Sequence, residues 1–551
     1  MFKHLLSQKL KEIIDKFLAD KNINEKILWS LDVPPKNFQA DFALNAAMPI
    51  AKKIKANPNL IAQELIGIIL QEIPQIKTAS IAGAGFINII IKDEVLYNEV
   101  ADILRLKKDY GKVYAKDTER VLIEFVSANP TGPLHIGHGR GAAIGDSLAR
   151  IFEHLGLKVS REYYLNDAGN QMLILGESLK ARYLELKGSK AEFPANHYQG
   201  SYIIDIAKKL VDTQKSIDEI DFTAEGVKDI LKTIEDDLAD FGVKFDTWFS
   251  ESDLAITKDK NGDTEVDKVC KYLKDEGSAY IKDSALWLAS TKYKDDKDRV
   301  LKRSDGRYTY LASDIAYHKN KYERGFDKLI NLLGADHHGY VARLKAAVHL
   351  LGFNEISLNV ILYQLVSLIR AGQPVAMSTR SGEFITLKEV VEDVGKDACR
   401  FFFLLRSPDS QLEFDLDIAK KQSSINPVFY VQYVNARCHS IIRESLKRKD
   451  LTLTPDLSLL KQKEERDLIK KLAQFCDILL ICQKTLSPHH FTTYLIELAD
   501  LFHKFYESCR VLTSDSSLSS ARLGLIKAVT VIIENGLDLL GVSAPKAMQS
   551  K

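Results

Sequence analysis

Two histidines three residues apart, His135 and His138, stand in a stretch rich in glycine and proline, SANPTGPLHIGHGRG at 127–141. An apolar run, VLIEFV at 121–126, precedes it and an apolar-periodic run follows, which predicts a strand, a turn and a helix. The unpaired N–H groups and the positive dipole end of such a helix attract anions. Imidazoles at that end can donate hydrogen bonds to phosphate oxygens that gain charge during group transfer.

The chain around this stretch predicts the kind of sheet that could hold the two histidines in place. From Val121 to about Ser407, strand-like apolar runs alternate with helical ones, as in a parallel α/β sheet. Open sheets of this kind bind ligands beyond the carboxyl ends of their strands. Gly137 and Gly139 would let a large flat ligand approach the backbone closely. We therefore expect a site for a phosphorylated ligand at 127–141.

The rest of the chain divides into segments of different pattern. Residues 1–112 mix helical and strand-like runs and are expected to form a small α/β domain. Residues 113–407 form the expected catalytic domain, with a polar, mostly helical insertion at about 180–290. Residues 408–551 show long amphipathic patterns, and 421–551 hold 18 Lys and Arg against 13 Asp and Glu. We expect a helical domain with a basic surface there.

The composition is that of a soluble globular protein, with 45% hydrophobic and 27% charged residues among 551. No apolar run of about 18 residues stands out, so we expect no membrane association. A net charge of +1 argues against a uniformly basic protein but leaves room for local nucleic-acid-binding patches. Six cysteines without a C-x-x-C spacing favour reduced thiols in a cytoplasmic protein over a zinc site.

The letters HIGH at 135–138 form the nucleotide-binding signature of class I aminoacyl-tRNA synthetases and related nucleotidyltransferases. The flanking sequence closely resembles that of bacterial-type arginyl-tRNA synthetases, as do SREYYLNDAGNQ (160–171), LGADHHGYVARL (333–344) and LLGVSAPKAM (539–548). This resemblance implies a multidomain α/β protein with a Rossmann-like parallel-sheet catalytic domain. It also implies a small α/β N-terminal additional domain that meets the tRNA elbow and an all-α C-terminal anticodon-binding domain.

The activity that the resemblance implies is the ATP-dependent ligation of arginine to tRNA. L-arginine attacks the α-phosphate of ATP to give arginyl-adenylate and pyrophosphate, and the arginyl group then passes to the 3′ end of tRNA(Arg). Such chemistry needs positioning and stabilisation of phosphate charge, and no protein nucleophile. ATP is a substrate and Mg²⁺ is expected to accompany it, held mainly by phosphates and water rather than by a dedicated protein site. The family expectation is a monomer.

A pocket for arginine should offer carboxylates, because the guanidinium is planar, always cationic and rich in donors. A carboxylate inside the apolar run VLIEFV would be buried, so Glu124 also needs a cationic partner on its own account. Tyr310 lies four residues before Asp314 and would share a helical face with it. By resemblance, with Asn166 as a further candidate, six residues line this pocket: Glu124, Asn129, Asp167, Gln171, Tyr310 and Asp314.

The motif GADHHGY at 334–340 follows the apolar run LINLL and is expected at the carboxyl end of another strand. By resemblance it binds the adenosine part of ATP, together with Gly137 and Gly139. Asp336 would accept hydrogen bonds from ribose hydroxyls, and His337 or its neighbour would contact the base. A metal site is disfavoured, because histidines adjacent in sequence rarely bind one ion.

The second class I signature, a Lys-Met-Ser-Lys loop that clamps the triphosphate, is degenerate here. In GQPVAMSTRSGEFITL (372–387), alanine and threonine replace the two lysines, while Met377 and Ser378 are retained. Arg380 follows directly and supplies positive charge. We expect Ser378 and Arg380 to act in catalysis and Met377 to contact ATP. The loss of both lysines predicts a larger share of the phosphate charge for His135 and His138.

The C-terminal domain offers candidate tRNA contacts on one helix, Gln432, Asn435 and Arg437, followed by further basic residues.

Three alternative functions predict sequences that differ from this one. A small nucleotidyltransferase with HIGH would lack the long helical C-terminus. Another class I synthetase would need a pocket without the pair Glu124 and Asp314. A catalytically silent tRNA-binding paralogue would lose ATP-site residues that this chain keeps.

Overall fold

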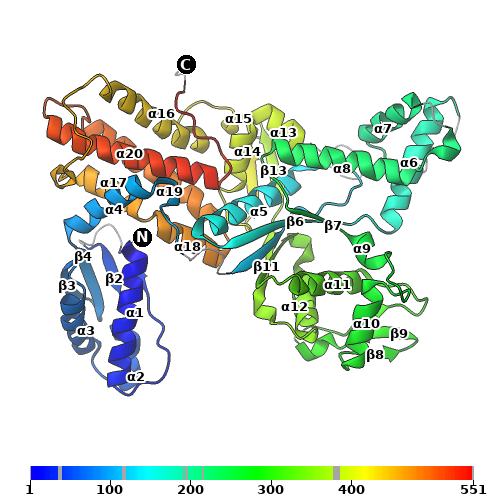
Figure 1. Cartoon of the computed structure of the whole chain (residues 1–551), viewed down its shortest axis with the longest axis horizontal. Coiled ribbons are helices and arrows are strands. Elements are labelled where there is room, and N and C mark those ends of the chain that lie inside the picture. The colour runs from blue at the N-terminus through cyan, green and yellow to red at the C-terminus, as the bar shows by residue number, and fades with distance from the viewer. Residues whose placement is uncertain are drawn as a thin grey trace.

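The structure is a computed structural model of the chain. It describes residues 2–34, 40–113, 119–189, 193, 196–213, 216–293, 295–375 and 385–548. Figure 1 shows an N-terminal α/β unit in blue, a central sheet from which helices extend to the right, and a stack of long helices in yellow to red. The fold predicted from the sequence, a multidomain α/β protein with a parallel sheet and a helical C-terminus, is confirmed.

The N-terminal unit is an antiparallel sheet covered by helices. Its strand order is β1-β2-β4-β3, and β4 alternates buried and less buried side chains as the run FINIII predicts. A last helix, α4, packs against the helical domain. The elements are α1 (Phe2–Asp20), β1 (Leu31–Asp32), β2 (Phe42–Leu44), α2 (Ala47–Ile54), α3 (Pro58–Glu72), β3 (Ile76–Ala82), β4 (Phe86–Ile91) and α4 (Asp93–Leu106).

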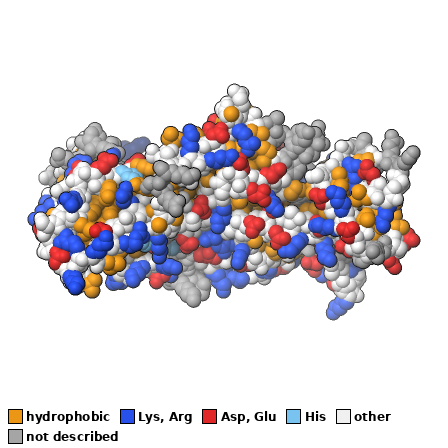
Figure 2. Space-filling view, turned by 90° about the horizontal axis from the view of Figure 1, so that it is seen from above, with side chains coloured by type: hydrophobic (Ala, Val, Ile, Leu, Met, Phe, Trp, Pro, Cys, Tyr) orange, Lys and Arg blue, Asp and Glu red, His pale blue; other side chains and the backbone are white. Residues whose placement is uncertain are grey.

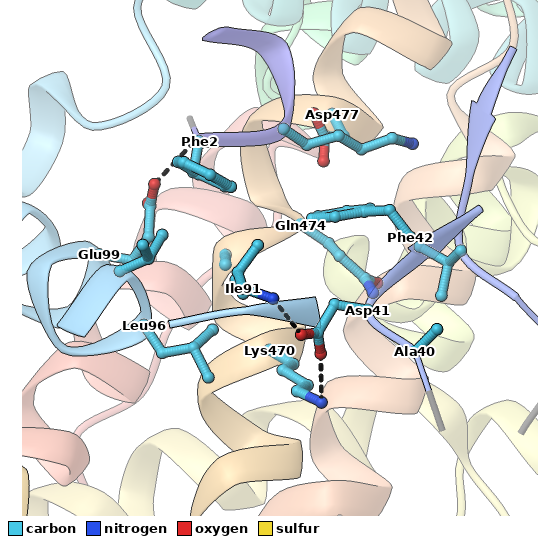
Figure 3. A pocket seen from close by; sticks show the side chains of 14 residues that line it. Phe2, Ala40, Asp41, Phe42, Ile91, Leu96, Glu99, Lys470, Gln474 and Asp477 are labelled. Carbon is cyan, nitrogen blue, oxygen red and sulfur yellow. Dashed lines mark hydrogen bonds and ion pairs between the residues drawn. The ribbon is translucent and has the colours of Figure 1, made fainter. Parts of the chain in front are cut away.

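A polar contact joins this unit to the helical domain around a small, mostly apolar pocket of about 100 Å³ (Figure 3). Asp41 accepts a hydrogen bond from the backbone N–H of Ile91 over 2.9 Å, and its other oxygen lies 2.6 Å from Lys470 Nζ. On the opposite side of the pocket, Glu99 accepts from the N–H of Phe2 over 2.7 Å. The Asp41–Lys470 pair connects the two units, whereas the Glu99 bond lies within the N-terminal unit.

The central domain is built on five parallel strands in the order β12-β11-β5-β6-β7. The chain moves outward from β5 through β6 to β7 and then returns to place β11 on the other side of β5. The order therefore reverses between β5 and β11, where ligands bind in sheets of this type. The strands are β5 (Arg120–Glu124), β6 (Lys158–Leu165), β7 (Thr247–Ser250), β11 (Lys328–Gly334) and β12 (Leu358–Tyr363).

Helices and a small second sheet surround the parallel strands. The small sheet has the order β14-β13-β15 and leads into the helical domain. The elements are η1 (Lys107–Asp109), α5 (Ile136–Leu155), α11 (Tyr310–Glu323), η4 (Ala335–Tyr340), α12 (Val341–Leu350), η5 (Glu355–Ser357), β13 (Val366–Arg370), β14 (Gln373–Pro374), α13 (Leu387–Val394), α14 (Lys396–Phe403), β15 (Leu412–Asp415) and α15 (Leu416–Ala419).

The region expected as one mostly helical insertion, 180–290, is not a single insertion. Its first part is helical and projects to the right in Figure 1, but β7 then pairs with β6 in the main sheet. A four-residue strand has little local signal and is decided by its long-range partner. An antiparallel sheet, β10-β9-β8, follows. The elements are α6 (Asn170–Leu186), α7 (Ser201–Asp212), η2 (Ile217–Glu219), α8 (Phe222–Asp240), α9 (Glu251–Ala255), α10 (Glu265–Asp275), β8 (Ala279–Lys282), β9 (Ala285–Leu288), η3 (Ser290–Tyr293) and β10 (Arg299–Lys302).

The C-terminal domain consists of packed helices, as the amphipathic patterns predict. Its helix α20 is long and apolar enough to cross a membrane by length and composition, yet 72% of its most apolar window is buried inside the protein. Burial of that kind is typical of the central helix of a bundle. The helices are α16 (Pro427–Ser445), η6 (Leu457–Leu459), α17 (Lys463–Ala473), α18 (Phe475–Thr485), α19 (His489–Ser508) and α20 (Ser516–Leu539).

A buried arginine connects the central and helical domains. Arg400, on α14, is fully buried, and its Nη2 lies 2.5 Å from the Asp146 carboxylate on α5. The same guanidinium donates to the carbonyl of Leu540, just beyond α20, over 2.7 Å and to that of Phe241, at the end of α8, over 3.2 Å. One side chain of α14 therefore fixes the ends of two helices, α8 and α20, relative to α5.

Gly541 makes room for this guanidinium, and its replacement tests the junction. Its φ is +66°, and an added Cβ would lie 2.4 Å from Arg400 Cζ. Gly352 has a φ of +85° but nothing within 4 Å of an added Cβ, so Gly352→Ala is the matched control for backbone strain alone. We expect Gly541→Ala to cost about 1–3 kcal/mol more than the control, because of overpacking. Denaturant unfolding measures the difference, and equal losses would show that Arg400 can move aside.

Candidate active site

The two histidines of the HIGH motif cap the first turn of α5. His135 is the N-cap, and its Nδ1 accepts a hydrogen bond from the N–H of Gly137 over 3.1 Å. His138 Nδ1 accepts from the N–H of His135 over 3.3 Å, and the two rings stack with centroids 3.7 Å apart. Because Nδ1 is the acceptor in each ring, the proton of the neutral imidazole lies on Nε2. The capping bonds thus leave an N–H donor at Nε2 of each ring.

Burial favours the neutral form of both imidazoles. Burial, reinforced by the neighbouring His135, lowers the pKa of His138 to about 3. Burial also lowers the pKa of His135, partly opposed by a backbone hydrogen bond. A neutral imidazole donates from Nε2 without carrying a charge that would have to be desolvated.

Helix α5 is held rigidly behind the histidines. Arg140 is fully buried and donates to three carbonyls of the chain that follows β12, those of Gln364, Ser407 and Ser410, over 2.8–2.9 Å. A Cβ on Gly139 would lie 2.5 Å from the Leu387 side chain, so this glycine permits close helix packing in the structure. The HIGH motif therefore lies at a capped helix end, and the turns of α5 that follow are held by Arg140 and by close packing at Gly139.

The carboxylate of Glu124, at the end of β5, is buried and has the cationic partner expected for it. That partner is Lys321 on α11, whose Nζ lies 2.5 Å from Glu124 Oε2 and which has no exposed surface. Ser127 donates to the other carboxylate oxygen over 3.1 Å. Glu124 is therefore placed at the strand end where the order of the sheet reverses.

Asp314 lies near Glu124 without a comparable partner. Its carboxylate accepts a hydrogen bond from the Tyr340 hydroxyl. Burial, together with the nearby Glu124 and Glu251, raises the pKa of Asp314 to about 7, against the opposing effects of Tyr340 and Lys321. Of the two carboxylates, Asp314 is therefore the one whose ionised form an added cation would stabilise more.

Two more predicted arginine-binding residues contact each other: Asn129 Nδ2 donates to Gln171 Oε1 over 2.8 Å. Asp167 instead binds the start of α9, accepting from the Ser250 hydroxyl over 2.6 Å and from the N–H of Ser252 over 3.1 Å. Both of its oxygens already have partners, which indicates a structural contribution.

The remaining predicted contacts of the small substrates are exposed. Tyr310 begins α11 and is 69% exposed. Asp336 and His337 lie in η4 directly after β11 and are also exposed. The Tyr340 side chain, from the end of the same 3₁₀ helix, reaches Asp314 and so joins the adenosine-side motif to the acidic cluster.

The degenerate signature loop falls outside the described residues, and with it the predicted Met377, Ser378 and Arg380. The described segment that follows it meets the HIGH motif directly. Thr386 forms an isolated antiparallel bridge with His135, and the N–H of Leu387 donates to the carbonyl of Leu134 over 2.8 Å. The two signatures of the sequence are thus connected at this bridge.

Two of the three predicted tRNA contacts are corrected by the structure. Gln432 and Asn435 are buried in α16, and their amides donate to the chain after α20, at Ser543, Ala544 and Pro545. They hold the C-terminal segment instead of facing solvent.

Only Arg437 of that set lies nearer the surface. Its guanidinium is 5.3 Å from the ring centroid of Tyr433 and 5.2 Å from that of Tyr506. The helical periodicity placed all three residues on one helix, but the packing of the C-terminal segment decided which of them is covered.

Sequence reasoning missed Lys321, Tyr340 and Glu251 as parts of the acidic pocket. Glu251 is buried at the start of α9, and burial raises its pKa. When the Asn166 amide is oriented so that its nitrogen faces acceptors, it donates to Glu251 Oε2 over 2.8 Å. The spacing of Lys321, seven residues after Asp314 on one helix, was the available signal. Within the described part of the chain, no group of three or more His, Cys, Asp or Glu is arranged to hold a metal ion.

Family models match three parts of the chain. The model described as "tRNA synthetases class I (R), catalytic domain" matches residues 99–402. "Arginyl tRNA synthetase N terminal domain" matches residues 2–91, and "DALR anticodon binding domain" matches residues 431–548. The three matches follow one another in the order of the units described above.

Individual proteins agree with these matches. The chain is 47% identical to the arginine–tRNA ligase of Elusimicrobium minutum, over 99% of this chain and 100% of that one. It is 46% identical to the arginine–tRNA ligase of Syntrophotalea carbinolica, over 94% and 95%. The structure of Thermus thermophilus arginyl-tRNA synthetase, 23% identical, superposes with a TM-score of 0.78 over 98% of this chain and 100% of that one, which shows the shared fold. The chain, with its capped HIGH helix beside a buried acidic pair, belongs to the arginyl-tRNA synthetase family of class I aminoacyl-tRNA synthetases.

Proposed function

We propose that the site between β5 and β11 carries out the arginine–tRNA ligation of this family, with Glu124 and Asp314 binding the guanidinium. The observation that carries the assignment is the cation-deficient Asp314, whose pKa is raised to about 7, beside the buried Glu124, at the point where the sheet order reverses. A guanidinium supplies a charge and several donors to two carboxylates at once. Asn129, Gln171 and Tyr310 complete the arginine site, and Asp167 supports it through α9.

In the first step, a carboxylate oxygen of arginine attacks the α-phosphorus of ATP, and the bond to the pyrophosphate oxygen breaks. We assign His135 and His138 to the phosphate oxygens, to which their Nε2–H groups donate as negative charge develops. The positive dipole end of α5 acts on the same charge, and Gly137, whose N–H donates to His135, is assigned to the close approach of ATP to the backbone. Gly139 contributes through the tight packing of α5.

Asp336 and His337 are assigned to the adenosine part of ATP, because η4 follows β11 at the same edge of the sheet. We propose that Mg²⁺ accompanies ATP and is held mainly by phosphate oxygens and water. Ser378, Arg380 and Met377 remain proposed contacts of the triphosphate.

In the second step, the 3′ end of tRNA(Arg) takes the arginyl group from the adenylate, and AMP is released. We propose that Arg437 with Tyr433 and Tyr506 forms part of the tRNA-binding surface, since a cation flanked by aromatic rings suits stacked bases. Lys and Arg side chains are frequent on the left part of Figure 2, the side of the helical domain. The N-terminal domain is assigned to the tRNA elbow.

We further propose that the protein works as a monomer in the cytoplasm. All six cysteines are free and buried, which suits a reducing compartment.

Aminoacylation of purified tRNA with each amino acid in the presence of ATP tests the activity. We expect charging with arginine alone and formation of AMP and pyrophosphate in equal amounts. Charging with a different amino acid would contradict the assignment of Glu124 and Asp314, and no charging at all would contradict the proposed activity.

The pH dependence of arginine binding tests Asp314. The guanidinium binds the ionised carboxylate, and the raised pKa of about 7 means that Asp314 takes up a proton as the pH falls below that value. The KM for arginine should therefore rise below pH 7, approaching about tenfold per pH unit. In Asp314→Asn it should be high and independent of pH over the same range. A wild-type KM that stays constant between about pH 6 and pH 8 would contradict the role.

Replacement of His138 tests stabilisation of the phosphate charge. His138→Asn keeps a side-chain acceptor for the cap but removes the imidazole donor. We expect kcat to fall about 100-fold or more, while the KM for arginine changes little. His349→Ala is the control, because this histidine pairs with Glu355 on the surface. Unchanged turnover in His138→Asn would remove His138 from the mechanism.

A further inference from the structure

Lys321 is a cation buried inside the acidic pocket, and its donors have partners. Its Nζ lies 2.5 Å from Glu124 Oε2 and 3.2 Å from Asn331 Oδ1. The same ammonium lies 4.1 Å from the ring centroid of Tyr317, over the face of the ring. A lysine with no exposed surface is costly to desolvate, so this one is retained only where its charge is compensated.

The strand register explains why two partners of Lys321 are available at one point. Glu124 on β5 pairs with Asn331 on β11, so these two residues lie side by side on neighbouring strands. The α11 residues Asp314, His318 and Lys321 follow a spacing of four and three, which puts them on one helical face.

A continuous hydrogen-bond network joins Lys321 to both carboxylate residues. Asn331 Nδ2 donates to His318 Nε2 over 2.8 Å, and His318 Nδ1 donates to the carbonyl of Asp314 over 2.7 Å. The donors and acceptors of Asn331 and His318 are consistent along the whole path, from the ammonium to the backbone of Asp314. A change at Lys321 is therefore transmitted to Glu124 directly and to Asp314 through two buried side chains.

Of the two carboxylates, Glu124 and Asp314, only Glu124 is paired directly with Lys321. The ammonium compensates Glu124, whereas the side-chain partner of Asp314 is the neutral hydroxyl of Tyr340. Ser127 and Lys321 each occupy one oxygen of Glu124, and each oxygen has a second lone-pair direction for another donor. An incoming guanidinium thus meets one carboxylate that is already paired and oriented, and one whose side-chain partner is a neutral hydroxyl.

We propose that Lys321 is a positioning residue for arginine recognition: it holds the Glu124 carboxylate in the orientation that the guanidinium requires. This inference rests on the proposed function, in which Glu124 and Asp314 bind the substrate. Lys321 does not touch arginine; it acts through Glu124. Its removal should therefore affect arginine binding mainly while residue 124 carries the carboxylate, with a smaller effect through Asp314, whose pKa Lys321 lowers.

A double-mutant cycle tests this dependence, using Lys321→Met, Glu124→Gln and the double variant in arginine-charging assays. We expect Lys321→Met to raise the KM for arginine about tenfold or more, with a smaller change in kcat and an unchanged KM for ATP. In the Glu124→Gln background, Lys321→Met should change the KM for arginine by less than about twofold. Lys321→Arg retains a buried cation and should stay closer to the wild type than Lys321→Met does.

Lys319→Met is the matched control on the same helix, because Lys319 pairs with Glu323 near the surface. It should leave the KM for arginine unchanged. Thermal unfolding of each variant reports the folded state. If Lys321→Met does not fold, the double variant, which removes both buried charges, is compared with Glu124→Gln alone.

Three outcomes are distinguishable. Equal KM values for arginine in Glu124→Gln and the double variant support the proposal when Lys321→Met itself raises KM or does not fold. An unchanged KM in folded Lys321→Met, or effects of the two substitutions that multiply, would overturn it. A normal KM for arginine in Glu124→Gln would instead contradict the proposed arginine site.

Discussion

The buried ion pair between Arg400 and Asp146 is the contact on which the arrangement of this protein depends. Asp146 lies on the same helix as the HIGH motif, and Arg400 reaches the ends of α8 and α20 through backbone carbonyls. Removing either partner would leave buried polar groups without hydrogen bonds, which costs more than the pair itself contributes. The helix that presents the catalytic histidines is therefore fixed to the domain assigned to tRNA binding.

In the proposed active site the cost of burying a charged group has the opposite result, because one carboxylate is left without a cationic side-chain partner. Here the side-chain partner of Asp314 is a neutral hydroxyl and its pKa is raised, so we assign the missing cation to the substrate. Burial lowers the pKa of both capping histidines, and the capping bonds determine which ring nitrogen carries the proton. The proposed contacts with the cationic substrate and with the anionic phosphates thus include the two ends of one segment, Glu124 at the end of β5 and His135 at the start of α5.

Several features were predictable because their causes are local. The apolar run before HIGH forms β5, the two histidines begin a helix, and the buried Glu124 has a cationic partner. Other features depend on distant segments. The strand β7 exists because β6 pairs with it, and Gln432 and Asn435 are buried because the chain after α20 returns to cover them. Helical periodicity alone could not show which polar face would be covered.

The sequence by itself determined the family, the parallel sheet and the chemical types assembled at its edge, since motifs, apolar runs and capping residues act over a few positions. Only the tertiary structure decided which cation compensates Glu124 and which ring nitrogen of each histidine carries the proton. It also decided which polar residues of α16 remain near solvent. Those properties depend on burial and on partners far apart in the chain, such as Lys321, which lies 197 residues from Glu124. Desolvation is a property of the assembled protein, and no short stretch of sequence specifies it.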